Sequence, residues 1–210
     1  MKRLFIIAAL LSALACAADV FLGTQRINTD SGITLGPQGI AKRYLGTQLI
    51  FEASAEEEVL LTPAMTSNTT PAPFVVAASS QFNASDWAAW RAFDQQAVNG
   101  WSSVLSAGTH WLSIRLDAVR TVTRLAIDQR VEYNWPNYYV TEFELYYRNS
   151  STDEWAYFGT YNPAAPVAAG DTTLDTAITG LQAQELKFVF TGNHTQNGSA
   201  SLGEIRLYGH

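Results

Sequence analysis

Apolar and polar residues alternate with a period of two in several short segments of the C-terminal two thirds of the chain. In the clearest of these segments, Leu112, Ile114 and Leu116 are each separated from the next by a single polar residue. The same alternation recurs in the segments 125–127, 143–147, 186–190 and 205–207. Because successive side chains of a strand point to opposite faces of a sheet, this pattern predicts an all-β protein whose strands form a β-sandwich.

Residues 19–62 follow a different pattern, which contains a short internal repeat. The segments 21–27 and 44–50 each begin with an aromatic and an aliphatic residue, continue with Gly-Thr-Gln and return to an aliphatic residue. Short apolar runs on both sides of a Gly-containing turn predict a small β-hairpin in each segment. We therefore expect residues 19–62 to form an N-terminal extension of β-hairpins that ends in a linker. Such hairpin units are similar to those of bacteriophage tail and fibre proteins.

The first 18 residues are typical of a signal peptide. A basic start at Lys2 and Arg3 precedes an almost wholly apolar stretch from Leu4 to Leu14, which is too short to span a bilayer. These features predict a secreted, cell-surface or periplasmic protein, and a retained anchor helix or buried strand is the alternative. Cys16 is the only cysteine, so no intrachain disulfide is possible, and lipidation of Cys16 is a further alternative.

Composition limits the classes of function. The 210 residues are 47% hydrophobic and 15% charged, which is sufficient apolar content for a buried core. The formal net charge is −6 and there is no run of basic residues. Binding to nucleic acid or to anionic lipid needs clustered Lys and Arg, so the sequence argues against a nucleic-acid partner and against membrane contact. The sequence contains no Gly-x-Ser-x-Gly, His-Glu-x-x-His or phosphate-loop motif, and we expect a protein that is not an enzyme.

Two parts of the chain carry a family resemblance. The segments 89–94 (AWRAFD) and 100–102 (GWS), together with the closing segment 201–209 (SLGEIRLYG), resemble the opening and closing motifs of a discoidin domain. This family is also called coagulation factor 5/8 type C, or galactose-binding-like. The resemblance implies a jelly-roll β-sandwich over residues 63–210 that binds rather than catalyses. It also implies that five aromatic residues belong to the core, namely Trp90, Phe93, Trp101, Trp111 and Trp155.

The same resemblance implies a structural calcium ion. In bacterial relatives a loop Asp, nearby backbone carbonyls and a Glu of the final strand bind Ca²⁺, and the matching side chains here are Asp94 and Glu204. Carbonyls of Arg91 and of residues 96–100 would complete the ligand set. Gln95 stands where relatives have Gly, and Gln adopts a positive φ less readily than Gly. The alternative is that Asp94 only caps a turn and Glu204 is an ordinary acid of an edge strand.

The aromatic-rich segment 130–139 is the natural candidate for a ligand-binding loop. Aromatic rings pack against the apolar face of a sugar, while Arg and Asn side chains form hydrogen bonds with its hydroxyls. The segments 86–87 and 191–199 would contribute further loops. The predicted ligand-binding residues are Trp87, Arg130, Tyr133, Asn134, Trp135, Asn193 and His194. Alternatively, the aromatic residues of segment 130–139 pack within the loop or begin the next strand.

The sequence thus predicts a non-catalytic discoidin module that binds a surface glycan or glycoconjugate and mediates adhesion. Residues 19–62 would be free to dock onto a partner. Two other functions stay open. One is a structural component of a phage tail or virion in which the sandwich is decorative, and the other is an accessory domain of a glycan-degrading system.

Overall fold

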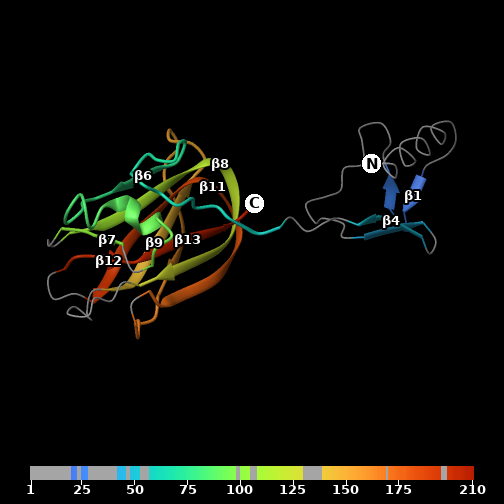
Figure 1. The fold of residues 1–210 in the computed structure, drawn as a ribbon. Helices are drawn as coiled ribbons and strands as arrows, with labels where there is room; N and C mark the ends of the chain where they lie inside the picture. Colours follow the sequence, from blue (N-terminus) through green and yellow to red (C-terminus); the bar gives the residue numbers. More distant parts are fainter. Residues whose placement is uncertain are drawn as a thin grey trace. The chain divides into compact units, whose positions relative to one another are not determined.

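The computed structural model describes residues 20–22, 25–27, 42–45, 48–52, 57–97, 100–104, 108–129, 139–168, 170–194 and 198–210. The chain divides into two compact units, residues 1–55 and residues 56–210 (Figure 1). Each unit is described by itself below. Among the described residues, no helix has the length and apolar character needed to cross a membrane.

The N-terminal unit contains two antiparallel hairpins. Strand β1 (Val20–Leu22) pairs with β2 (Gln25–Ile27), and β3 (Lys42–Leu45) pairs with β4 (Gln48–Glu52). Both coincide with the repeat in the sequence, so the two predicted hairpins are confirmed.

The second unit is built almost entirely of strands, which confirms the predicted all-β class. Its elements are β5 (Val59–Leu60), β6 (Val75–Ala78), the 3-10 helix η1 (Ala89–Phe93), β7 (Trp101–Ser102), β8 (His110–Asp128), β9 (Tyr139–Arg148), β10 (Ala156–Tyr161), β11 (Thr172–His194), β12 (Ser201–Leu202) and β13 (Glu204–Gly209). The strand order of the main sheet is β10-β9-β11-β8-β13-β5, with β6 pairing with β8 as well. All pairs are antiparallel.

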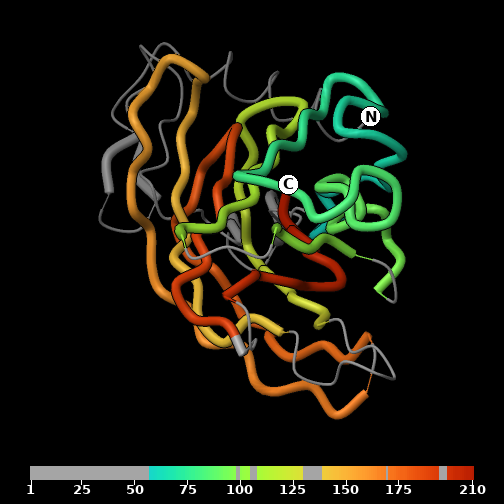
Figure 2. Tube along the Cα trace, turned by 90° about the vertical axis from the view of Figure 1, so that its left-hand side faces the viewer, coloured from blue at the N-terminus to red at the C-terminus, as the bar shows by residue number. Residues whose placement is uncertain are grey.

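The long strands β8 and β11 connect the two layers of the sandwich. The first half of β8 pairs with β6 and with the second half of β11, whereas the second half of β8 pairs with β13 and with the first half of β11. Between the two halves, Arg115 pairs with Glu185 and Arg120 pairs with Ala183. Four residues of β8, 116–119, therefore stand opposite a single residue of β11, Gln184. Extra residues on one strand bend it, so this bulge lets the hydrogen-bonded sheet fold over onto itself. The curved course of both strands can be followed in Figure 2.

The core lies between the layers and follows the alternation seen in the sequence. Leu112, Ile114 and Leu116 from one layer are fully buried in the same cluster as Ile205 and Leu207 from the other. This arrangement confirms the jelly-roll β-sandwich.

Of the five aromatic residues expected in the core, Phe93 and Trp101 are fully buried. Trp90 is half-buried and packs against the core. The assignment of Trp111 and Trp155 to the core was wrong, because both are half-buried outside the core cluster. Trp111 lies one residue before Leu112, which is buried, and the period of two therefore places it on the outer face of β8.

Strand β5 is part of the sandwich. Val59 and Leu60 pair with Gly209 and Tyr208 of β13, and the backbone N–H of Leu61 donates to the carbonyl of Leu207 (2.7 Å). The second unit therefore contains residues before 63, which the sequence analysis placed in the linker.

Candidate functional site

Asp94 and Glu204, the two predicted calcium ligands, lie in one buried site. Asp94 ends helix η1 and Glu204 begins strand β13. Only 5% of Asp94 and 1% of Glu204 is exposed. The carboxylate of Glu204 accepts a hydrogen bond from the backbone N–H of Gln95 (N to Oε2, 3.1 Å), which joins the two segments directly.

Gln95 adopts the backbone conformation that glycine would favour. Its φ is 62°, in the left-handed region, which costs a residue with a Cβ about 1 kcal/mol. Two hydrogen bonds offset this cost. The backbone N–H donates to Glu204, and the side-chain Nε2 donates to the carbonyl of Thr62 (3.2 Å). The loop thus keeps a glycine-like course without a glycine.

Burial raises the pKa of both carboxyl groups. Desolvation raises the pKa of Glu204 to about 8, and the neighbouring Asp94 carboxylate contributes to the increase. Desolvation also raises the pKa of Asp94, although the hydrogen bond from the Gln96 N–H (2.9 Å to Oδ1) and the charge of Arg91 act in the opposite direction. The Arg91 guanidinium is 3.8 Å from Asp94 Oδ2, too far for a hydrogen bond. In the absence of a cation, Glu204 therefore binds a proton near neutral pH.

Two buried oxygen atoms of this site, Asp94 Oδ2 and Glu204 Oε1, have no hydrogen-bond partner among the described residues. Such atoms are costly to bury, and a hard divalent cation would satisfy both. Gly203 also allows a close approach of backbone, since a Cβ there would lie 2.4 Å from the carbonyl oxygen of Ala97. The described residues offer no group of three His, Cys, Asp or Glu side chains that could hold a metal. The two carboxylates are hard oxygen donors, the kind of ligand that calcium prefers.

Four of the predicted ligand-binding residues, Arg130, Tyr133, Asn134 and Trp135, lie outside the described residues. The residues on either side of this segment are described. Gln129 follows β8, and Tyr139 begins β9, as the alternative interpretation of this tyrosine expected.

Gln129 joins these two flanks and was missed by the sequence analysis. Its buried side chain forms two hydrogen bonds with Val140: Nε2 donates to the carbonyl (2.7 Å), and Oε1 accepts from the N–H (3.3 Å). Its backbone N–H donates to the carbonyl of Asp171, and its carbonyl accepts from the N–H of Gly170. Gln129 thus fixes the described flanks of segment 130–138. The only signal in the sequence is a pair of polar residues, Asp128 and Gln129, directly after the apolar residues 125–127, which is also typical of any loop.

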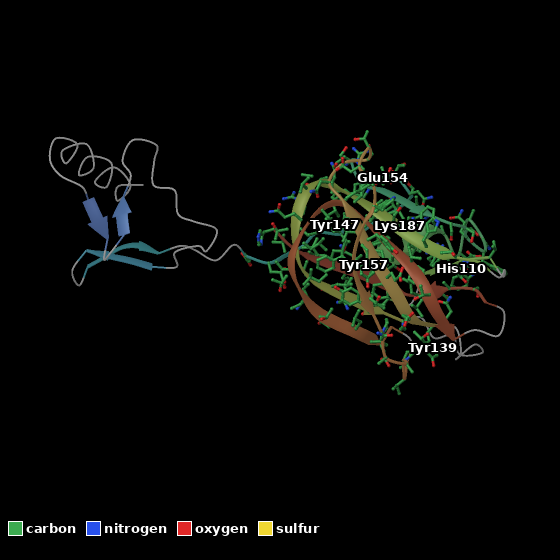
Figure 3. All side chains as sticks on the ribbon, turned by 180° about the vertical axis from the view of Figure 1, so that it is seen from behind. His110, Tyr139, Tyr147, Glu154, Tyr157 and Lys187 are labelled. Carbon is green, nitrogen blue, oxygen red and sulfur yellow. The ribbon has the colours of Figure 1, made fainter. Side chains whose placement is uncertain are left out.

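Asn193 and His194 lie at the same end of the sheet as these flanks. They end β11 and pair with Val140 and Tyr139 of β9, respectively. Figure 3 labels Tyr139 at this end. The Oδ1 atom of Asn193 is buried and has no hydrogen-bond partner within the described parts of the chain.

Trp87, the remaining predicted ligand-binding residue, lies on a different segment. It is half-buried in the turn before η1, where its backbone N–H donates to the carbonyl of Asn83 (3.2 Å).

Comparison with known families agrees with this geometry. The family model described as "F5/8 type C domain" matches residues 75–205, more than half of the chain. The chain belongs to the F5/8 type C family. The matched region runs from β6 to the start of β13 and includes both Asp94 and Glu204. The resemblance noted in the sequence is therefore confirmed.

Solved structures share the fold of this F5/8 type C domain. The F5/8 type C domain of a Bacteroides fragilis protein has a TM-score of 0.55 at 20% identity, over 68% of this chain and 95% of that chain. The family 32 carbohydrate-binding module of NanJ from C. perfringens was solved in complex with galactose. It has a TM-score of 0.54 at 20% identity, over 72% of this chain and 99% of that chain. Chitosan-binding module 1 of a chitosanase/glucanase from Paenibacillus sp. IK-5 has a TM-score of 0.51 at 21% identity, over 68% of this chain and 96% of that chain. A comparison with curated proteins finds no match.

Proposed function

We propose that this F5/8 type C domain is a non-catalytic carbohydrate-binding module. The observation that carries the proposal is the agreement of its family and fold with sugar-binding modules. One structural neighbour was solved in complex with galactose and another with GalNAc-β-1,3-galactose. Similarity at this level of identity supports a saccharide ligand as a class and leaves the particular sugar to experiment.

The ligand site would lie at the end of the sheet where β11 ends and β9 begins. Gln129 fixes the flanks of segment 130–138 there, and Asn193 adds a polar group whose Oδ1 atom lacks a partner among the described residues. In this proposal Arg130 and Asn134 bind sugar hydroxyls, and Tyr133 and Trp135 stack on the sugar ring. His194 and Trp87 belong to the same proposed set.

A calcium ion at Asp94 and Glu204 would have a structural role. When bound, the ion would neutralise two buried carboxylates and fix the end of η1 to the start of β13. The two buried oxygen atoms without hydrogen-bond partners support this proposal.

The biological setting that we propose is adhesion to surface glycans by an exported protein. The apolar N-terminal segment supports export. One observation favours a second candidate: the two similar hairpins β1-β2 and β3-β4 suit assembly, as in a phage tail or virion component. A third setting, an accessory module of a glycan-degrading system, is suggested by the neighbour derived from a chitosanase/glucanase.

Calorimetric titration of the full chain with galactose, GalNAc and the disaccharide GalNAc-β-1,3-galactose would test the site. We expect saturable binding to at least one of these sugars, which Arg130→Ala and Trp135→Ala each weaken by about tenfold or more. Tyr157→Ala is the control, because Tyr157 is an exposed aromatic residue on β10. Equal affinities of all four proteins would contradict the loop site. If no sugar binds and light scattering shows a stable oligomer, the structural role is favoured instead.

A further inference from the structure

The outer face of the sheet carries a groove that lies away from the proposed loop site. It contains Lys187 of β11, which Figure 3 shows between Glu154 and Tyr139. The volume of the groove is about 350 Å³, within the range of pockets that hold small ligands. From Lys187 to His194, the last residue of β11, the strand advances seven residues, or roughly 23 Å at 3.3 Å per residue. The groove and the loop end of the sheet are therefore separate surfaces.

The register of the strands explains the hollow. Ala77 of β6, Ser113 of β8 and Lys187 of β11 lie side by side in one row across the outer face. Ala77 and Ser113 have short side chains, so they form a low floor. The next row holds longer side chains, Val75, Arg115, Glu185 and Arg148, which border that floor.

Two tryptophan rings form walls of the groove. The Nζ atom of Lys187 lies 5.2 Å from the ring centroid of Trp111 and 5.5 Å from that of Trp155. The Arg148 guanidinium lies 4.4 Å from the Trp155 centroid. Cation–π contacts at these distances hold the indoles in place.

The groove has an excess of positive charge. Glu185 is the one acidic residue among those described as lining it, and Arg148 binds Glu185 through Nε (2.9 Å) and Nη2 (2.6 Å). Within the described part of the chain, Arg115 and Lys187 form no ion pair. Two cations are thus available in a groove of a protein whose net charge is −6. This local charge is complementary to an anionic ligand.

We propose that this groove binds a carboxylated saccharide, whose carboxylate lies between Arg115 and Lys187 and whose ring packs against the indoles of Trp111 and Trp155. The combination of flat aromatic walls with charged donors suits a sugar ring that bears a carboxylate. An acidic peptide is disfavoured, because peptides commonly bind at a free strand edge. The groove instead lies across β6, β8, β11 and β9, with β8 and β11 paired on both sides. This site goes beyond the loop site and does not depend on it.

The test is calorimetric titration of the full chain with tri-galacturonate and, separately, with its fully methyl-esterified form. Esterification removes the negative charges and keeps the sugar rings. We expect the acid to bind at least about tenfold more tightly than the ester, since each charge-assisted hydrogen bond contributes a factor of this size. Higher salt should weaken the binding of the acid, because salt screens exposed charges.

Variants identify the surface. Lys187→Gln and Arg115→Gln should each reduce the affinity for tri-galacturonate by about tenfold. Arg120→Gln is the matched control, because Arg120 is on β8 like Arg115 and forms an ion pair with Asp117 outside the groove. Arg120→Gln should leave the affinity unchanged. Because all three replaced side chains lie on the surface, thermal denaturation will show whether each variant is folded.

Three results would overturn the proposal: equal binding of the acid and the ester, equal affinities of the groove variants and the Arg120→Gln control, or binding of hexa-aspartate with no binding of tri-galacturonate. The loop site and the groove are tested by different variants, so a failure of one proposal can be told from a failure of the other. Arg130→Ala and Trp135→Ala should leave tri-galacturonate binding intact, and Lys187→Gln should leave the binding of galactose or GalNAc intact.

Discussion

Replacing Glu204 by Gln should remove a pH dependence that the metal-free protein carries in its stability. Burial raises the pKa of Glu204 to about 8 in the folded protein, compared with 4.5 for the unperturbed group. Between these two pH values the folded protein keeps a proton that the unfolded chain releases. The free energy of unfolding should therefore fall as pH rises from about 4.5 to about 8, and should change little above that range.

The size of this effect follows from the difference between the two pKa values. At about 1.4 kcal/mol per pH unit, the interval from 4.5 to about 8 corresponds to roughly 5 kcal/mol for Glu204 alone. Asp94 changes stability in the same direction, because burial also raises its pKa. Asp128 and Arg91 are the other charged groups that act on this pair, and Asp128 further raises the pKa of Glu204. Against a total stability of about 5–15 kcal/mol for a domain, such a loss is large.

Urea denaturation in EDTA at pH 5, 6, 7 and 8 measures this dependence. The wild-type protein should lose several kcal/mol over this range, and Glu204→Gln should lose much less, because Gln is neutral throughout. Millimolar CaCl₂ at pH 8 should restore the stability of the wild type but not of Glu204→Gln, since a ligand that binds only the folded state stabilises it. The same pH slope in both proteins would refute the electrostatic reasoning. No effect of CaCl₂ on the wild type would refute the calcium site.

Two other substitutions test how the loops are held. Gln129→Leu should lower the free energy of unfolding by about 2–4 kcal/mol, because the buried N–H and carbonyl of Val140 lose their side-chain partners. Urea denaturation measures this loss. A loss below about 0.5 kcal/mol would show that Gln129 does not fix the loop flanks. Gly203→Ala should cost about 1–3 kcal/mol because its Cβ would meet the Ala97 carbonyl oxygen at 2.4 Å. Thermal denaturation compares it with Gly108→Ala, whose Cβ has no neighbour within 4 Å, and equal melting temperatures would contradict the close approach.

The sequence predicted those features that depend on local patterns. The period of two identified Leu112, Ile114 and Leu116 as core residues, and the same period would have placed Trp111 on the outer face. The family motif predicts Trp111 in the core, but the alternation, which places it on the outer face, agrees with the structure. Its surroundings explain why a large aromatic residue is stable there: the Lys187 ammonium of the neighbouring strand lies 5.2 Å from its ring centroid, within the range of a cation–π contact.

Features that depend on long-range pairing could not be predicted from periodicity. Glu204 and Gln95 are 109 residues apart and meet because β13 pairs with the second half of β8. The family resemblance supplied that proximity, whereas alternation does not say which strands pair. Neither source indicated the groove, because Arg115 and Lys187 become neighbours only through the register of β8 and β11. The side chain of Gln129 is a similar case, since its partner Val140 lies 11 residues further along the chain.

A glycan array probed with the full chain in the presence of calcium tests the central proposal most directly. A carbohydrate-binding module should bind a defined subset of glycans, and free monosaccharide from that subset should compete. If the protein is folded by circular dichroism and binds no glycan on a broad array, the proposal that this F5/8 type C domain recognises carbohydrate is contradicted.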